Sequence, residues 1–500
     1  MMSYRIPHWI NGARRDGGSG DAASEVFDPA TGNVQGLVSL AGEEIVGDAV
    51  AAASAAAPDW RATSLAHRAE VLFAFRELVA AGRDELAEVI TSEHGKVLAD
   101  ARGEIARGLE IVELACGLHQ LLKGGYTEGA SRSVDVYSIR QPLGVVGIIS
   151  PFNFPAMVPL WFFPLAIAAG NTVVLKPSEK DPSAAMWLAE RFKDAGLPRG
   201  VFNVVHGNKP AVDALLEHPK VAGVSFVGST SVARYVHERG SAAGKRVQAL
   251  GGAKNHMVVL PDVDLDLAAD AAVNASFGSA GERCMSISVV VAVEPVADEL
   301  IARMQERITP LRTGDGRRGC DMGPLVTAEH RDRVASYLDR GVQEGAKLVV
   351  DGRDLANVEG EPGGFWLKPS LFDHVTPDMS VYTDEIFGPV LSVVRVRSYD
   401  EAVRLVNANP YGNGTALFTH DGRAARRFQY EVEVGMVGIN VPIPVPIGAY
   451  PFGGWKSSLF GDLHAYGEDG IRFYTRGKVV TSRWPEPSDG GIDLGFPRST

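Results

Sequence analysis

From residue 144 onward, the chain repeats one pattern: a short apolar run, a loop, and a segment with helical spacing. The first four apolar runs are GVVGIIS, NTVVLKPSE, VFNVVHG and VAGVSFVGS. Such alternation predicts a doubly wound parallel sheet with helices on both faces. In this α/β architecture, ligands bind beyond the carboxyl ends of the strands. We therefore expect functional residues in the loops that follow these runs.

A second alternating block begins with HMVVLPDVDL at His256 and continues to about Val441, which predicts a second α/β domain. Before both blocks, residues 41–122 carry apolar residues at three- and four-residue spacing and predict helices. Residues 131–140 (SRSVDVYSIR) alternate apolar and polar positions. This predicts a strand, which we expect to form an arm outside the main body. The segment VVTSRW, near Lys478, is a candidate partner strand for that arm.

The composition is that of a globular protein, with 45% hydrophobic and 22% charged residues in 500. The net charge of −12 argues against a nucleic-acid partner, which needs a basic face. Three cysteines without zinc-site spacing predict no metal centre and no disulfide framework, and they fit a reducing cytoplasm. The start of the chain lacks the apolar core of a signal peptide, and residues 156–169 are too short for a membrane span and predict a buried helix. We therefore expect a cytoplasmic protein without a membrane partner.

One cysteine, Cys284, follows a glycine-punctuated turn (SFGSAGERCMSIS, residues 276–288) and precedes a β-branched run. Beside Arg283, in a loop that enters a strand, it is a candidate nucleophile, because nearby positive charge lowers the pKa of a thiol. The alternative is a small buried apolar residue, which is the commoner role of an isolated cysteine.

Polar residues stand at the ends of the predicted strands. Asn153 in PFNFP is either a donor to a developing oxyanion or a turn-forming asparagine. Lys176 and Glu179 in KPSE form either a surface pair or a site for the ribose hydroxyls of an adenine nucleotide, where the carboxylate would repel a 2′-phosphate. Ser229 in FVGST can cap a helix whose free amides suit a pyrophosphate, although capped helices are general in α/β proteins. Glu385 in DEIFGPV lies in a loop before an apolar strand, and its alternative is an exposed acid.

These motifs together resemble the NAD(P)-dependent aldehyde dehydrogenase superfamily. The resemblance runs from HWINGARRDGG to YTRGKVVTSRW and rests on PFNFP, KPSE, FVGST, LGG, GERC, EIFGPV and PFGG in this order. It implies a Rossmann-type NAD-binding domain in residues 1–130 and 144–253 and a catalytic domain in residues 254–445. It also implies a β oligomerisation arm and tail in residues 131–143 and 474–500, and a homodimer or homotetramer.

The resemblance implies roles for individual residues. Cys284 would be the nucleophile, with Asn153 and the Cys284 backbone amide as donors to the oxyanion. Lys176 and Glu179 would lie at the adenosine ribose and Ser229 near the pyrophosphate. The full set expected at NAD is Phe152, Lys176, Glu179, Ser229, Glu385 and Phe387.

One position departs from the family pattern. Hydrolytic members carry a glutamate immediately before LGG, whereas this sequence reads QALGG and has Ala249 there. Water, with a bulk pKa of about 15.7, is a poor nucleophile without a base. A thiol with a pKa of about 8.5 is partly ionised near neutral pH, so a coenzyme A thiol needs no such carboxylate. One alternative is a hydrolytic aldehyde dehydrogenase, in which Glu282 or Glu468 replaces the base, or one with another substrate. The other alternative is a non-catalytic family member.

Within the superfamily, GERCMSIS, VQALGGAKNHMVVLPD and NVPIPVPIGAYPFGGWKSSLFGD resemble the CoA-acylating methylmalonate-semialdehyde and malonate-semialdehyde dehydrogenases. This likeness implies NAD-dependent oxidation of such a semialdehyde, loss of CO2, and transfer of the acyl group to CoA as propanoyl-CoA or acetyl-CoA. It assigns Arg107 and Arg283 to the substrate carboxylate, a role that a guanidinium suits because it binds carboxylates bidentately. Exposed helix charge is the alternative for Arg107, and tuning of Cys284 is the alternative for Arg283. Which semialdehyde is preferred stays open.

Overall fold

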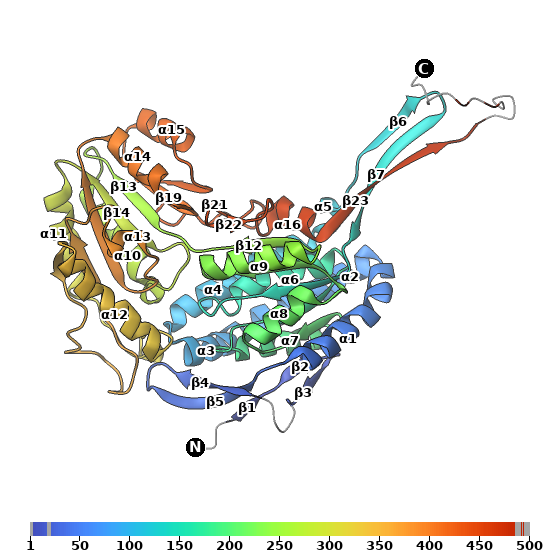
Figure 1. The fold of residues 1–500 in the computed structure, drawn as a ribbon, viewed down its shortest axis with the longest axis horizontal. Coiled ribbons are helices and arrows are strands. Elements are labelled where there is room, and N and C mark those ends of the chain that lie inside the picture. The colour runs from blue at the N-terminus through green and yellow to red at the C-terminus, as the bar shows by residue number, and fades with distance from the viewer. Residues whose placement is uncertain (1–3, 18–21, 486–491, 493, 495–500) are drawn as a thin grey trace.

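The structure is a computed structural model that describes residues 4–17, 22–485, 492 and 494. Two α/β units lie side by side, and a narrow three-stranded arm projects from one of them (Figure 1). The predicted α/β class with a β arm is confirmed. The division into domains by residue number stays a prediction.

The first unit is built on an eight-stranded sheet in the order β22-β12-β11-β8-β9-β10-β2-β3. Its five middle strands are parallel, and antiparallel β22, β2 and β3 complete its edges. The order reverses at β8, with β9 and β10 on one side and β11 and β12 on the other. Such a reversal opens a crevice at the carboxyl ends of the strands. The strands are β2 His8–Ile10, β3 Ala13–Arg15, β8 Val145–Ile149, β9 Thr172–Lys176, β10 Phe202–Val204, β11 Val221–Val227, β12 Arg246–Leu250 and β22 Leu459–Phe460.

Continuous apolar runs form the middle of this sheet because helices cover both faces. Val146 and Ile148 of β8 face a core with α2, α4, α6 and α7, whereas Val145 and Ile149 face a core with α1, α8 and α9. Every residue of α6 is buried, which confirms the predicted buried helix. The helices of this unit are α1 Glu43–Ala62, α2 Leu65–Ala81, α3 Arg83–His94, α4 Leu98–Cys116, α5 Leu118–Leu121, α6 Met157–Ala168, α7 Ser183–Asp194, α8 Lys209–Glu217, α9 Thr230–Ala242 and α16 Gly467–Tyr474.

The second unit is a seven-stranded sheet in the order β15-β16-β17-β14-β13-β19-β20, in which only β15 is antiparallel to its neighbour. Its core is a separate apolar cluster, as a second α/β unit requires. The strands are β13 Asn255–Val259, β14 Ile287–Val293, β15 Lys347–Val350, β16 Ser370–Asp373, β17 Val390–Val396, β19 Gly414–Phe418 and β20 Met436–Ile439. The helices are α10 Leu265–Phe277, α11 Ala297–Ile308, α12 Ala328–Gln343, α13 Ser380–Thr383, α14 Tyr399–Ala408 and α15 Gly422–Glu431, with short 3-10 turns at Gly278–Gly281 and Gly316–Arg318.

The arm consists of β6 (Tyr126–Ser131), β7 (Val134–Pro142) and β23 (Thr475–Arg483). β23 runs antiparallel to β7 along its whole length, which confirms the predicted pairing of these distant segments. The sequence did not predict β6, which crosses the expected boundary at residue 130 and pairs with β7. The arm has no fully buried face despite the alternation in β7, because it stands away from the main body (Figure 1). Most of the predicted tail beyond residue 485 lies outside the described residues.

Small strands complete the structure. They form a three-stranded sheet near the amino terminus and a two-stranded ladder, from β1 Tyr4–Ile6, β4 Ala23–Asp28, β5 Asn33–Ser39, β18 Tyr411–Gly412 and β21 Trp455–Lys456. Within the described part of the chain, no helix has the length and apolar character to cross a membrane.

Candidate active site

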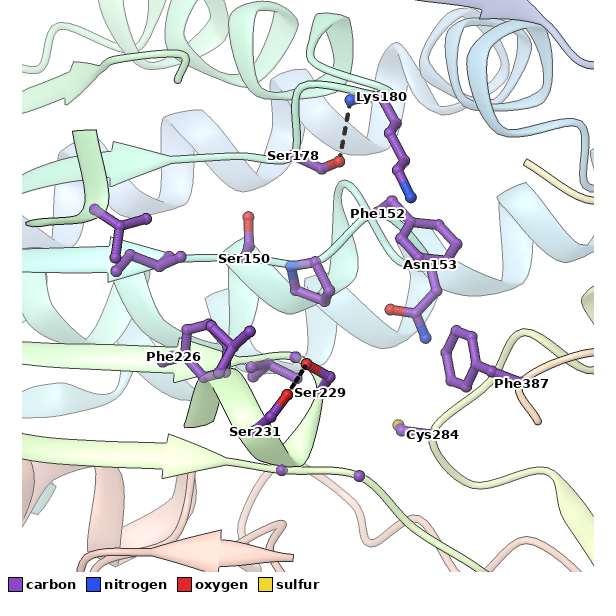
Figure 2. Close-up of a pocket in the computed structure, with 18 of the residues that line it drawn as sticks. Ser150, Phe152, Asn153, Ser178, Lys180, Phe226, Ser229, Ser231, Cys284 and Phe387 are labelled. Atoms are coloured by element: carbon purple, nitrogen blue, oxygen red, sulfur yellow. Dashed lines mark hydrogen bonds between the residues drawn. The ribbon is translucent and has the colours of Figure 1, made fainter. Parts of the chain in front are cut away.

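Two cavities meet at Cys284. The larger, about 790 Å³, lies beyond the carboxyl ends of β8, β9, β11 and β12 (Figure 2). The smaller, about 430 Å³, lies between α4, the start of α6 and residues 443–452. Cys284 lines both, so its thiol stands at the boundary between a crevice at the sheet's switch point and a second chamber.

A strained turn holds Cys284 in this place. Ser279 and Ala280 have φ of +52° and Gly281 has φ of +72°. A Cβ at Gly281 would lie 2.2 Å from the carbonyl oxygen of Gly388, so only glycine fits. The Asn255 side chain then donates to the Cys284 carbonyl oxygen at 2.9 Å. The glycines that mark the turn in the sequence thus fix the cysteine against two neighbouring segments.

The thiol of Cys284 is not activated in this state. Burial raises its pKa to about 12, and the negative charge of Glu385 acts in the same direction. The Arg283 guanidinium lowers the pKa, but its effect is smaller. Arg283 thus acts on the pKa of Cys284 in the predicted direction, but desolvation outweighs the effect of one nearby cation.

Arg283 and Arg107 both line the smaller cavity. Each already has a carboxylate partner on α4. Arg283 Nη2 pairs with Asp100, and Arg107 Nη1 donates to both carboxylate oxygens of Glu110 at 2.7 and 2.9 Å. Arg107 also donates to the Pro446 carbonyl oxygen at 2.6 Å. The Arg107 side chain is 34% exposed, and its role at a substrate carboxylate stays a prediction.

Asp100 and Glu104 were not predicted as site residues, and they lie on the same face of α4 as Arg107. The signal was available, because positions 100, 104 and 107 have the four- and three-residue spacing that aligns side chains on one helix face. All three line the smaller cavity.

Asn153 is buried in the loop after β8 and lines the larger cavity with Cys284. Its Nδ2 donates to the Glu282 carbonyl oxygen at 3.0 Å. Figure 2 shows Asn153, Phe387 and Cys284 gathered at one end of the cavity. An amide with one N–H anchored and a second free to face the cavity can donate to an oxyanion formed at the thiol.

Lys176, Glu179 and Ser229 also line the larger cavity. Lys176 Nζ donates to the Gly207 carbonyl oxygen at 2.7 Å and lies 3.4 Å from a Glu179 carboxylate oxygen, and burial lowers its pKa. Ser229 precedes α9 without a side-chain cap, so the first amides of that helix remain available. Uncapped amides, a lysine and an accessible carboxylate suit the pyrophosphate and ribose of a dinucleotide.

Phe152 and Phe387 meet edge to face, with ring centroids 5.9 Å apart. Lys180 Nζ lies 4.6 Å from the centroid of the Phe152 ring. His330 Nε2 lies 2.7 Å from the Phe387 carbonyl oxygen, and Phe387 has φ of +60°. Lys180 and His330 line the same cavity and carried no signal in the sequence, because their partners come from distant segments.

Glu385 is a partly buried acid of the larger cavity. Its Oε1 accepts a hydrogen bond from the Ala253 amide at 2.8 Å, and burial raises its pKa to about 7. A Cβ at Gly252 would lie 2.2 Å from Glu385 Oε2, so the second glycine of LGG makes room for this carboxyl. The alternative of an exposed acid does not hold.

Ala249 is fully buried in β12, where it pairs with Phe226 and Phe460. Neither of the two acids considered as a replacement base lines either cavity. The Glu282 carboxyl lies 3.4 Å from His330 and 3.7 Å from His94, and the exposed Glu468 pairs with Arg472.

The chain is similar over almost its full length to known proteins. The sequence model of the Aldehyde dehydrogenase family matches residues 16–480. A malonate-semialdehyde dehydrogenase of Pseudomonas aeruginosa is 55% identical over 484 residues, covering 96% of this chain and 97% of the relative. A malonate-semialdehyde dehydrogenase of Geobacillus kaustophilus is 49% identical over 460 residues, covering 92% and 95%.

Solved structures show the same similarity at the level of the fold. A chain of Sinorhizobium meliloti 1021, described as a methylmalonate-semialdehyde dehydrogenase complexed with NAD, superposes with a TM-score of 0.95 at 52% identity, covering 97% of this chain and 99% of that one. A methylmalonate-semialdehyde dehydrogenase of Oceanimonas doudoroffii gives 0.95 at 50% identity with the same coverage. With the motifs, the fold and the cysteine between two cavities, these matches show that the chain belongs to the aldehyde dehydrogenase family.

Proposed function

We propose that this protein oxidises methylmalonate or malonate semialdehyde with NAD and transfers the acyl group to CoA, through a thioacyl intermediate on Cys284. The observation that carries the proposal is the placement of Cys284 between two cavities. One has the groups that suit a dinucleotide, and the other has two guanidinium groups that suit a carboxylate. Relatives at 49–55% identity are named malonate-semialdehyde dehydrogenases, and a solved structure at 50% identity is named a methylmalonate-semialdehyde dehydrogenase, which supports these substrates.

The larger cavity fits NAD. Its volume of about 790 Å³ is in the usual range for ligand sites, and it ends at the uncapped start of α9. Lys176 and Ser229 would hold the phosphates and ribose. Glu179 would accept from the ribose hydroxyls and disfavour a 2′-phosphate, which favours NAD over NADP. When bound, NAD supplies the acceptor for the aldehyde hydride.

In the first half-reaction, the Cys284 thiolate attacks the aldehyde carbon, and the carbonyl oxygen becomes an oxyanion. Asn153 Nδ2 and the Cys284 backbone amide donate to this oxygen. The tetrahedral adduct then loses hydride and becomes a thioester on Cys284. Because the resting thiol has a pKa of about 12, ligand binding must lower that pKa before attack.

Arg107 and Arg283 bind the substrate carboxylate in the smaller cavity. This carboxylate is β to the thioester carbonyl once the acyl group is on Cys284. Its C–C bond then breaks to release CO2, the electron pair passes to the thioester carbonyl, and the resulting enolate takes up a proton. The acyl group left on Cys284 is propanoyl from methylmalonate semialdehyde and acetyl from malonate semialdehyde.

In the second half-reaction, the CoA thiolate attacks the thioester and Cys284 leaves as a thiolate. Ala249 supports CoA rather than water as the acceptor, since no carboxylate stands where hydrolytic members activate water. The placement of Glu282 and Glu468 outside both cavities supports the same choice.

Product analysis tests this proposal. Each semialdehyde is incubated with NAD and CoA, acyl-CoA is identified by mass spectrometry, and released CO2 is quantified. We expect one acyl-CoA and one CO2 for each NADH, with propanal giving propanoyl-CoA and no CO2. Free acid in place of acyl-CoA would contradict the CoA-acylating assignment.

We also propose that the protein is a cytoplasmic homodimer or homotetramer assembled through its arm. The arm projects from the body, and Val479 and Tyr126 are 70% and 64% exposed on it, so both offer apolar surface to a second copy of the chain. Light scattering of the intact chain and of a Val479→Asp variant tests this, with a smaller particle expected for the variant. An unchanged particle mass would contradict the role of the arm.

A further inference from the structure

A buried ion pair lies behind the loop that carries Asn153. Lys96 Nζ is 2.7 Å from Glu104 Oε2, and both side chains are 0% exposed. Lys96 lies in the short connection between α3 and α4, and Glu104 lies in α4. A buried ion pair is retained at little or no net gain in stability unless its remaining hydrogen-bonding groups are satisfied.

The remaining hydrogen bonds of Lys96 and Glu104 are made to the backbone of the Asn153 loop and the start of α6. Lys96 Nζ donates to the Asn153 carbonyl oxygen at 2.6 Å and lies 4.3 Å from the centroid of the Phe154 ring. Glu104 Oε1 accepts from the backbone amides of Ala156 and Met157, at 2.8 and 3.0 Å.

These contacts fix the loop at both ends. The start of α6 lacks a side-chain cap from its own segment, so Glu104 takes the place of that cap from α4. Lys96 holds the backbone of Asn153, while the Glu282 carbonyl oxygen holds its side-chain nitrogen at 3.0 Å. The backbone and the amide of Asn153 are thus anchored from opposite sides.

We propose that Lys96, supported by Glu104, is a positioning residue that sets the Asn153 amide for the oxyanion formed at Cys284. The proposal rests on the proposed function, because it needs Asn153 as the oxyanion donor. The position of the Asn153 amide matters because a misplacement of about 1 Å at a reacting centre can slow the reaction about 100-fold. Removal of one oxyanion donor slows such reactions by about 100- to 1,000-fold.

A double-mutant cycle tests the proposal. Lys96→Met and Asn153→Ala are made singly and together, and single-turnover NADH formation is measured with propanal, which has no carboxylate. Asn153→Ala keeps the backbone carbonyl that Lys96 binds. We expect Lys96→Met to slow the step about 10- to 100-fold in the native background and less than about threefold in the Asn153→Ala background.

Controls separate positioning from general stability. NAD affinity and thermal midpoint are measured for each variant, and we expect unchanged NAD affinity. Arg395→Met removes a bidentate partner of Asp373 in the second sheet, at 3.0 and 2.9 Å. It should lower the thermal midpoint without slowing NADH formation in either background. If Lys96→Met does not fold, Lys96→Arg keeps the charge beside Glu104 but moves the donor, and the same dependence on Asn153 is expected.

Equal slowing by the Lys96 variant in both backgrounds would overturn the positioning role. An Asn153→Ala enzyme that forms NADH at the native rate would contradict the proposed function, and this inference with it. The two failures are distinguishable because the first leaves the Asn153 effect intact.

Discussion

The guanidinium of Arg283 is paired with the carboxylate of Asp100, which lies 183 positions earlier in the chain, on α4. Their side chains are 21% and 24% exposed, and both line the smaller cavity with Cys284. A substrate carboxylate that binds Arg283 must therefore compete with a carboxylate of the protein. In the proposed reaction, Asp100 is in place to neutralise Arg283 again once the substrate carboxylate has left as CO2.

Asp100→Asn is the direct probe of this competition. Asparagine keeps an oxygen acceptor beside Arg283 but removes the charge, so the substrate carboxylate meets a weaker competitor. Since the pair is partly exposed, we expect a modest effect, a KM for the semialdehydes about three- to tenfold lower. The KM for propanal should not change. Asp84→Asn, which alters the exposed Arg102 pair outside the cavity, is the matched control. An equal change for propanal would refute competition at the carboxylate site.

The two arginines themselves should discriminate between substrates. Arg107→Leu and Arg283→Leu each remove a charged donor to the carboxylate, worth about 1.5–3 kcal/mol, or at least about tenfold in KM for the semialdehydes. Propanal turnover should be altered less than about threefold. Steady-state kinetics with both substrates check this, with Arg102→Leu as the control. An equal loss of activity with the semialdehydes and with propanal would contradict the role of these arginines in binding the substrate carboxylate.

The fold explains why sequence found some of these groups and not others. β8 and β9 are buried on both faces, so they read as unbroken apolar runs and mark the loops that follow, including the one with Asn153. Cys284 stood out because the glycines before it are required by its turn. These are local signals in the sequence, and they identify many of the loops that line the larger cavity.

The remaining features depend on contacts between distant segments. The pairing of Arg283 with Asp100, and of Lys96 with the Asn153 loop, cannot be read from spacing within either segment. The pKa of Cys284 cannot be read from the sequence either, because burial raises it more than Arg283 lowers it. The strand β6 was missed because it lacks an apolar face.

Glu385 should control the reactivity of the resting thiol. Its charge raises the pKa of Cys284, and its own pKa of about 7 means that it is ionised above neutral pH. Glu385→Gln should therefore speed alkylation of Cys284 by iodoacetamide several-fold at pH 9 and change it little at pH 6. Mass spectrometry of the modified peptide gives the rates, with Glu294→Gln as a control. If the native protein and the Glu385→Gln variant were alkylated at the same rate at pH 9 as well as at pH 6, electrostatic control by Glu385 would be contradicted.

Glu282 should make stability depend on pH. Burial raises its pKa from 4.5 to about 8, so the folded protein binds a proton that the unfolded chain has released. Stability is then greatest below about pH 4.5 for this group and falls as the pH rises through 8. His330, with a pKa of about 4, stays neutral across that window. Glu282→Gln should flatten the fall in thermal midpoint between pH 5 and 8, and an unchanged slope would contradict the assignment.

The requirement for CoA after the first turnover tests the central claim most directly. NADH is followed by rapid mixing of the enzyme, NAD and malonate or methylmalonate semialdehyde, without CoA and then with it. We expect one NADH for each Cys284 without CoA, followed by arrest, and sustained turnover once CoA is added. Sustained NADH formation without CoA would show that water hydrolyses the thioester. It would contradict the inference that, with Ala249 in place of a glutamate, the enzyme does not activate water.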